Sequence, residues 1–253
     1  MRSPSLAVAL ALATVLAVAG CSSEPGASAP VASTTPAAKP TTPATTPTAS
    51  TTPTSTLTPS AKPARTTPPK DTRTGKQLAT PYEVDGIIVV SKKHRISAGY
   101  GPADPTGPYH LEAAAASALA KMTAAARADG VRIRVHSGYR SWATQNASYQ
   151  RALRNYPQNI SFYAPAGASE HQTGLAVDLW DGVTWSLPMA RTATGKWLFR
   201  HAHEYGFVLR YPDGKTKITG YHYEPWHYRY IGKRDARKFP NNTLTLEEYL
   251  GLA

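Results

Sequence analysis

The chain has 253 residues, a formal net charge of +12 and a single cysteine. One cysteine cannot form an internal disulfide, so a fold held together by disulfides is excluded. The positive charge favours anionic partners, and its meaning depends on the compartment in which the chain works.

The first twenty residues have the pattern of a secretory signal. Arg2 supplies the positive end, a mostly apolar run covers 6–19, and Cys21 closes the sequence Val-Ala-Gly-Cys. This ending resembles the bacterial lipoprotein signal box and predicts that Cys21 becomes the lipidated N-terminus. We therefore expect an N-terminal lipid anchor that holds the protein on the extracytoplasmic face of the cell membrane. The alternative is an ordinary cleaved signal with an incidental cysteine.

Residues 21–76 are predicted to form a disordered tether. Thr, Pro, Ala and Ser dominate this segment as far as about Pro69, and it has almost no large apolar side chain to bury. Such a chain cannot repay the entropy lost on folding. At about 3.1 Å per residue the stretch from Ser22 to about Pro69 has a maximal reach of about 150 Å, which suits a target in a wall outside the membrane. Because an exported chain seldom meets nucleic acid, we expect anionic wall polymers and no nucleic acid as partners.

Residues 77–253 have the size of one ordinary domain. Apolar and alternating runs predict strands at 87–90, 131–135, 175–179, 207–210 and 226–231. Helical periodicity predicts helices at 108–129, 142–155 and 196–205. The pair Thr245 and Glu248 matches a capping box and announces a short last helix. This irregular order predicts an α+β fold, with a small antiparallel sheet flanked by helices.

Three segments, 137–141, 169–178 and 221–227, are dense in polar side chains although strand-like residues flank them. Catalytic zinc takes three protein ligands from His, Asp, Glu or Cys. His171 and Asp178 are seven residues apart, which is about 10 Å along a helix and places them on opposite faces of an uninterrupted strand. We expect a turn between them that lets both reach one ion, because the intervening sequence contains a glycine.

Three motifs in this order resemble the signatures of the VanY-type zinc D-alanyl-D-alanine carboxypeptidases, whose fold group includes lysostaphin and hedgehog domains. The motifs are Ser-Gly-Tyr-Arg-Ser at 137–141, Ser-Glu-His-Gln-Thr-Gly-Leu-Ala-Val-Asp-Leu at 169–179 and Glu-Pro-Trp-His-Tyr-Arg-Tyr-Ile-Gly at 224–232. The resemblance extends from about residue 81 to residue 232. It implies a zinc metallocarboxypeptidase with one Zn²⁺ per domain, which removes the terminal D-Ala from peptidoglycan stem peptides.

The resemblance also implies roles for individual residues. His171, Asp178 and His227 match the zinc ligands, Glu224 matches the general base, and Arg140 matches the cation that stabilises the oxyanion. A looser match places four further residues in the substrate pocket: Ser137, Tyr139, Gln145 and Ser169.

Several alternatives stay open at this stage. His222 competes with His227 for the third ligand position. The same metal site would serve an L,D-carboxypeptidase acting on tetrapeptide stems, an endopeptidase cutting cross-links, or a metal-dependent amidase with another substrate. A non-catalytic zinc-containing wall-binding module is a further alternative, although such a protein has no need of a base such as Glu224. The sequence makes no prediction of the oligomeric state.

Overall fold

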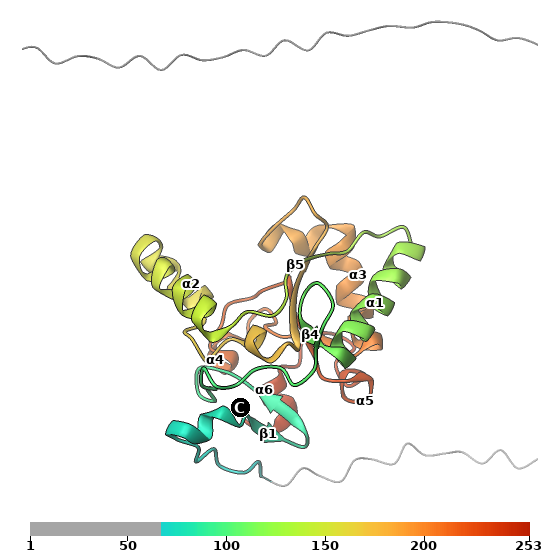
Figure 1. Ribbon diagram of the computed structural model, residues 1–253. Helices are drawn as coiled ribbons and strands as arrows, with labels where there is room; N and C mark the ends of the chain where they lie inside the picture. The colour runs from blue at the N-terminus through green and yellow to red at the C-terminus, as the bar shows by residue number, and fades with distance from the viewer. Residues whose placement is uncertain (1–66) are drawn as a thin grey trace, which may run out of the picture. The chain divides into compact units, whose positions relative to one another are not determined.

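The computed structural model of the protein describes residues 67–253 (Figure 1). The expected signal peptide, Cys21 and the tether as far as residue 66 lie outside the described residues. Contacts with the domain begin before the expected start at Gln77. Arg73 Nη1 donates to the Thr80 carbonyl at 2.6 Å, and the Tyr82 hydroxyl donates to the Pro69 carbonyl. Arg73 and Pro69 therefore attach this segment to the domain.

An antiparallel sheet forms the centre of the described part of the chain. Its four strands follow the order β5-β6-β8-β7. They are β5 (Arg134–Ser137), β6 (Ala176–Trp180), β8 (His227–Tyr230) and β7 (Phe207–Leu209). Two small hairpins pair β1 (Tyr82–Val84) with β2 (Ile87–Val89) and β3 (Pro105–Thr106) with β4 (Leu111–Glu112). The predicted α+β class with a small antiparallel sheet is confirmed.

The longer helices are α1 (Ala113–Ala128), α2 (Trp142–Asn155) and α3 (Ala193–His201). The short ones are α4 (Thr216–Thr219), α5 (Lys233–Ala236) and α6 (Leu246–Leu250). Turns of 3-10 helix add η1 (Gly75–Ala79), η2 (Pro157–Phe162), η3 (Glu170–Thr173), η4 (Leu187–Arg191) and η5 (Ala202–Tyr205). Within residues 67–253, no helix combines the length and the apolar character that crossing a membrane requires.

Two apolar clusters support this arrangement. In the larger one, α1 and α3 pack against the sheet through residues such as Met122, Leu198 and Leu179. In the smaller one, α6 packs against the β1-β2 hairpin, and Figure 1 shows the C-terminus beside β1. The C-terminal helix is therefore an integral part of the domain.

The largest differences between the observed and the predicted element boundaries lie in three places. The helix predicted at 108–129 begins at Ala113, because 105–112 forms the β3-β4 hairpin with His110 at a φ of 48°. The strand predicted at 131–135 is shifted to 134–137. The helix predicted at 196–205 begins at Ala193, and its end is the separate 3-10 turn η5. The capping box that begins α6 is confirmed, with both of its hydrogen bonds present.

Candidate active site and metal centre

The predicted turn between His171 and Asp178 is confirmed. The 3-10 turn η3 carries His171 and ends at Gly174, whose φ is 68° and whose N–H donates to the His171 carbonyl. A Cβ at Gly174 would lie 3.0 Å from Pro102 Cβ. Glycine therefore suits this position twice, because it adopts the positive φ without strain and leaves room for Pro102. Strand β6 starts two residues later, at Ala176, and carries Asp178 back to within 3.2 Å of His171 Nε2.

The third candidate ligand comes from the neighbouring strand. His227 begins β8 and stands directly opposite Asp178 in the β6-β8 register, so their side chains share one face of the sheet. His227 Nδ1 lies 3.1 Å from Asp178 Oδ1. The candidate ligand atoms of His171, Asp178 and His227 all lie within 4.8 Å of one another, and all three residues are buried. Two imidazoles and one carboxylate form a donor set that suits zinc.

A hydrogen bond of the second ring nitrogen, Nδ1, orients the side chain of His171. Nδ1 lies 2.6 Å from the Gly138 carbonyl, which can only accept, so Nδ1 carries the proton in this hydrogen bond. The lone pair of the neutral ring is then on Nε2, the atom that faces Asp178. A backbone carbonyl behind a metal-binding histidine fixes its tautomer in this way in known metal sites. The residues present therefore fit a zinc ion.

Glu224 is a buried carboxyl group beside these ligands. Its Oε2 lies 3.8 Å from His227 Nδ1. Burial raises the pKa of Glu224 to about 8, and the positive charges of His227 and Arg140 only partly oppose this effect. A bound cation would lower this pKa, because it favours the charged form. Glu224 can thus exchange a proton near neutral pH, as a general base requires.

The two histidines differ in their electrostatic surroundings. Burial lowers the pKa of His171, against the opposing effect of Asp178. Burial also acts to lower the pKa of His227, but the neighbouring carboxylates of Asp178 and Glu170 outweigh it and raise that pKa to about 9. A metal ion must therefore displace a proton from His227, since only the neutral ring can bind it.

Arg140 faces the same site from the loop after β5. Its backbone N–H donates to the His171 carbonyl at 3.2 Å, which links the first and second motifs. Its buried Nε has no hydrogen-bond partner among residues 67–253, so it can bind a ligand. Its positive charge acts to lower the pKa of both Glu224 and His171.

A cavity of about 640 Å³ contains the site. Arg140, Glu224 and the three candidate ligands line it, together with Ser137, Gln145 and Ser169 of the predicted pocket. Tyr139 is not among the lining residues, and its backbone N–H donates to the Tyr109 carbonyl at 2.9 Å. Gln145 Nε2 donates to the Ala164 carbonyl at 2.6 Å, so Gln145 also fixes the loop on its side of the cavity.

An aromatic wall of the cavity escaped the sequence analysis. His136 stacks on Trp185 at 3.9 Å between ring centroids, and Trp185 lies 5.3 Å from Trp226. An irregularity in the β5-β6 register between Val135 and Ser137 allows consecutive residues of β5 to line the cavity. His222, the competing candidate for the third ligand, lies outside the three-residue cluster. Its Nε2 hydrogen-bonds Ser161 Oγ at 2.8 Å instead.

Glu170 is a second residue that the sequence analysis missed. It precedes His171 in the second motif, is fully buried and accepts hydrogen bonds from Arg210 and Arg229. Burial acts to raise its pKa, but the two guanidinium groups hold that pKa well below its usual range. The sequence signal that could have identified Glu170 is its position, since it is a carboxylate directly beside the predicted zinc ligand His171.

Known proteins resemble this chain in sequence and structure. A family profile described as VanY, D-alanyl-D-alanine carboxypeptidase, matches residues 108–233. A D-alanyl-D-alanine carboxypeptidase of Enterococcus faecium is 36% identical over 165 residues, which cover 65% of this chain and 51% of that protein. The chain spans about half to two thirds of the length of the curated relatives that it matches.

Two solved structures extend the comparison. The LdcB LD-carboxypeptidase, whose structure is described as revealing the basis of peptidoglycan recognition, matches with a TM-score of 0.60 and 32% identity, covering 70% of this chain and 96% of that one. A mutant of the vancomycin resistance D,D-pentapeptidase VanY in complex with Zn(II) matches with a TM-score of 0.57 and 34% identity, covering 64% and 97%.

Proposed function

We propose that this chain is a zinc metallocarboxypeptidase that removes the terminal D-Ala from peptidoglycan stem peptides. The premise is that the chain belongs to the VanY family of D-alanyl-D-alanine carboxypeptidases. The observation that carries the proposal is the convergence of His171, Asp178 and His227, whose ligand atoms lie within 4.8 Å of one another in the cavity that also holds Glu224. A binding module would have no use for a buried base at that position. We propose one zinc ion per domain.

The chain's own residues can carry out the proton transfers of hydrolysis. Zinc held by the three ligands supplies a Lewis acid and lowers the pKa of water to about 7. Glu224 accepts the proton of the attacking water and afterwards delivers it to the leaving amine. Its low exposure, 7%, limits competition from bulk water for that proton.

Arg140 is proposed to stabilise the charge that develops on the carbonyl oxygen of the scissile bond. The guanidinium lines the cavity together with Glu224, and its Nε is free of other hydrogen bonds among residues 67–253. A donor that finds its acceptor only as negative charge appears stabilises the transition state more than the ground state.

The D,D-carboxypeptidase activity has one close competitor. The similarity to the LdcB LD-carboxypeptidase, with a TM-score of 0.60, favours an L,D-activity on tetrapeptide stems through the same metal site. Ser137, Gln145 and Ser169 are the proposed substrate-lining residues in either case, because they stand in the cavity beside the ligands.

The deciding experiment incubates the purified full-length chain with pentapeptide and tetrapeptide muropeptides and identifies the products by mass spectrometry. Loss of one alanine from the pentapeptide, abolished by a chelator and restored by zinc, is the expected result. Loss from the tetrapeptide alone would support the L,D-activity, and cleavage of cross-linked dimers alone would support an endopeptidase. Glu224→Gln is the inactive control, and Glu204→Gln, at an exposed ion pair with His201, is the matched surface control.

We also propose that Cys21 carries a lipid and that the chain is held on the extracytoplasmic face of the cell membrane. The support is the sequence alone: Arg2, the apolar run at 6–19 and the position of the single cysteine. Labelled fatty acid should enter the wild-type chain in bacterial cells and not Cys21→Ser. Equal labelling of both would refute the anchor.

A further inference from the structure

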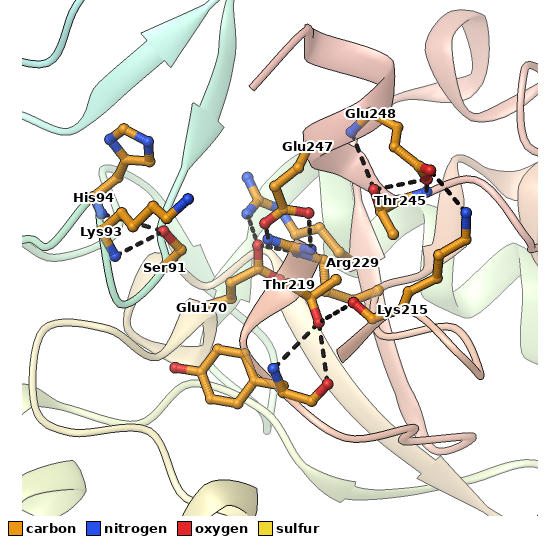
Figure 2. Close-up of polar contacts among 12 residues, drawn as sticks. Ser91, Lys93, His94, Glu170, Lys215, Thr219, Arg229, Thr245, Glu247 and Glu248 are labelled. Carbon is orange, nitrogen blue, oxygen red and sulfur yellow. Dashed lines mark hydrogen bonds and ion pairs between the residues drawn. The ribbon is translucent and has the colours of Figure 1, made fainter. Parts of the chain in front are cut away.

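The carboxylate of Glu170 lies between the candidate metal centre and a pair of buried arginines. Its Oε1 accepts hydrogen bonds from Arg210 Nε at 2.8 Å and from Arg229 Nη1 at 2.9 Å. Arg210 and Arg229 are each 1% exposed and Glu170 is 0% exposed. Figure 2 shows Glu170, Arg229 and Glu247 gathered in one group of polar contacts.

The second oxygen of Glu170 faces His227. Glu170 Oε2 and His227 Nε2 lie 3.5 Å apart, slightly beyond a good hydrogen bond. Among residues 67–253 neither atom has a hydrogen-bond partner, although both are buried. The other ring nitrogen of His227 faces Asp178, on the side of the candidate ion. Two orphaned buried atoms that face each other can form the bond after a small rotation of either side chain.

The arginines connect Glu170 to parts of the chain far from the metal ligands. Arg210 donates to both oxygens of Glu247, from Nη1 at 2.8 Å and from Nη2 at 2.6 Å. This bidentate pair fixes the guanidinium in one orientation. Arg229 Nη2 donates to the Ile88 carbonyl in β2 at 2.7 Å. Glu247 in α6 and Ile88 both lie outside residues 108–233, which the family profile matches.

We propose that Glu170 is a positioning residue that orients His227 for zinc, and that Arg210 and Glu247 hold Glu170 in place, so that the C-terminal helix α6 contributes to zinc affinity. This inference rests on the zinc centre of the proposed function. A carboxylate that accepts the N–H of a ligating imidazole fixes its tautomer and raises its basicity, and removing such a partner typically costs 10–100-fold in metal affinity.

The test uses the full-length chain and two readouts, the zinc dissociation constant from competition with a chelator and the melting temperature of the chelated protein. Glu170→Gln should weaken zinc binding by about 10–100-fold. Glu247→Gln keeps the side-chain volume but removes the charge that holds Arg210. This substitution should weaken zinc binding by about 3–10-fold, a smaller effect because Glu247 acts on Glu170 only through Arg210.

Glu248→Gln is the matched control, because it is the next residue of the same helix. Its carboxylate pairs with Lys215 and completes the capping box at Thr245, away from the arginines. This substitution should lower the melting temperature of the chelated protein and leave the zinc dissociation constant unchanged. If Glu247 served only to stabilise the helix, Glu247→Gln and Glu248→Gln would therefore have the same zinc affinity.

Unchanged zinc affinity in a folded Glu170→Gln protein would overturn the positioning role, and equal losses in Glu247→Gln and Glu248→Gln would overturn the contribution of α6. If Glu170→Gln does not fold, the comparison of the two α6 variants decides: weaker zinc binding in Glu247→Gln alone supports the proposal. Absence of zinc binding by the wild-type chain would instead overturn the proposed function, and the inference with it.

Discussion

Replacing Glu224 by glutamine should make the protein inactive and, without metal, more stable. Glutamine has nearly the same volume as glutamate but neither ionises nor accepts a proton at neutral pH. Loss of the general base should lower kcat by about 10²–10⁴-fold, which corresponds to about 3–5 kcal/mol of transition-state free energy. Zinc content should not change, since Glu224 is not among the three ligands.

The gain in stability follows from the pKa of Glu224, which burial raises from 4.5 to about 8. Between these values the unfolded chain releases the proton and the folded chain retains it, so stability falls as pH rises. At pH 7, 2.5 units above 4.5, and at about 1.36 kcal/mol per unit, the cost is about 3 kcal/mol. Glutamine removes this cost, which should raise the melting temperature by about 6–12 °C.

The assay is thermal denaturation of the chelated wild-type and Glu224→Gln proteins at pH 5 and pH 7. At pH 5 the difference should shrink to about 1–3 °C, because this pH lies only about half a unit above 4.5, the pKa of glutamate in the unfolded chain. Bound zinc should also reduce it, since a nearby cation favours the ionised carboxylate. A difference in melting temperature that is the same at both pH values would refute the assignment of Glu224 as a buried carboxyl with a raised pKa.

Three further predictions concern neighbouring residues. His171→Ala should lose both zinc and activity, measured as metal content after dialysis and as alanine release; full zinc occupancy would remove His171 from the ligand set. Arg140→Lys should retain zinc but lower kcat by about 10–10²-fold, because an ammonium lacks the planar fork of donors; an unchanged kcat would exclude the oxyanion role. In metal-free Glu224→Gln, the contribution of His227 to stability should be full below pH 6.5 and lost as pH rises through about 9, while zinc affinity rises over the same range. Melting temperatures that do not fall between pH 6.5 and 9 would contradict the raised pKa of His227.

The turn that brings His171 back to Asp178 was predictable because its determinants are local. The spacing of His171 and Asp178 required a turn, and the intervening Gly174 supplies it with a φ of 68°. The capping box at Thr245 was likewise predictable, because both of its hydrogen bonds join residues three positions apart. The β3-β4 hairpin was missed because the apolar periodicity of the following helix continues into Leu111, which is buried in β4.

The sequence by itself determined which candidate metal donors, which candidate base and which candidate cation the chain offers. Only the tertiary structure decided how these groups are held. The β6-β8 register sets Asp178 opposite His227, 49 residues away in the chain. Glu170 meets Arg210 and Arg229 across separations of 40 and 59 residues. Local periodicity carries no information about such pairs, because the register of strands and the burial of charges depend on how the whole domain packs.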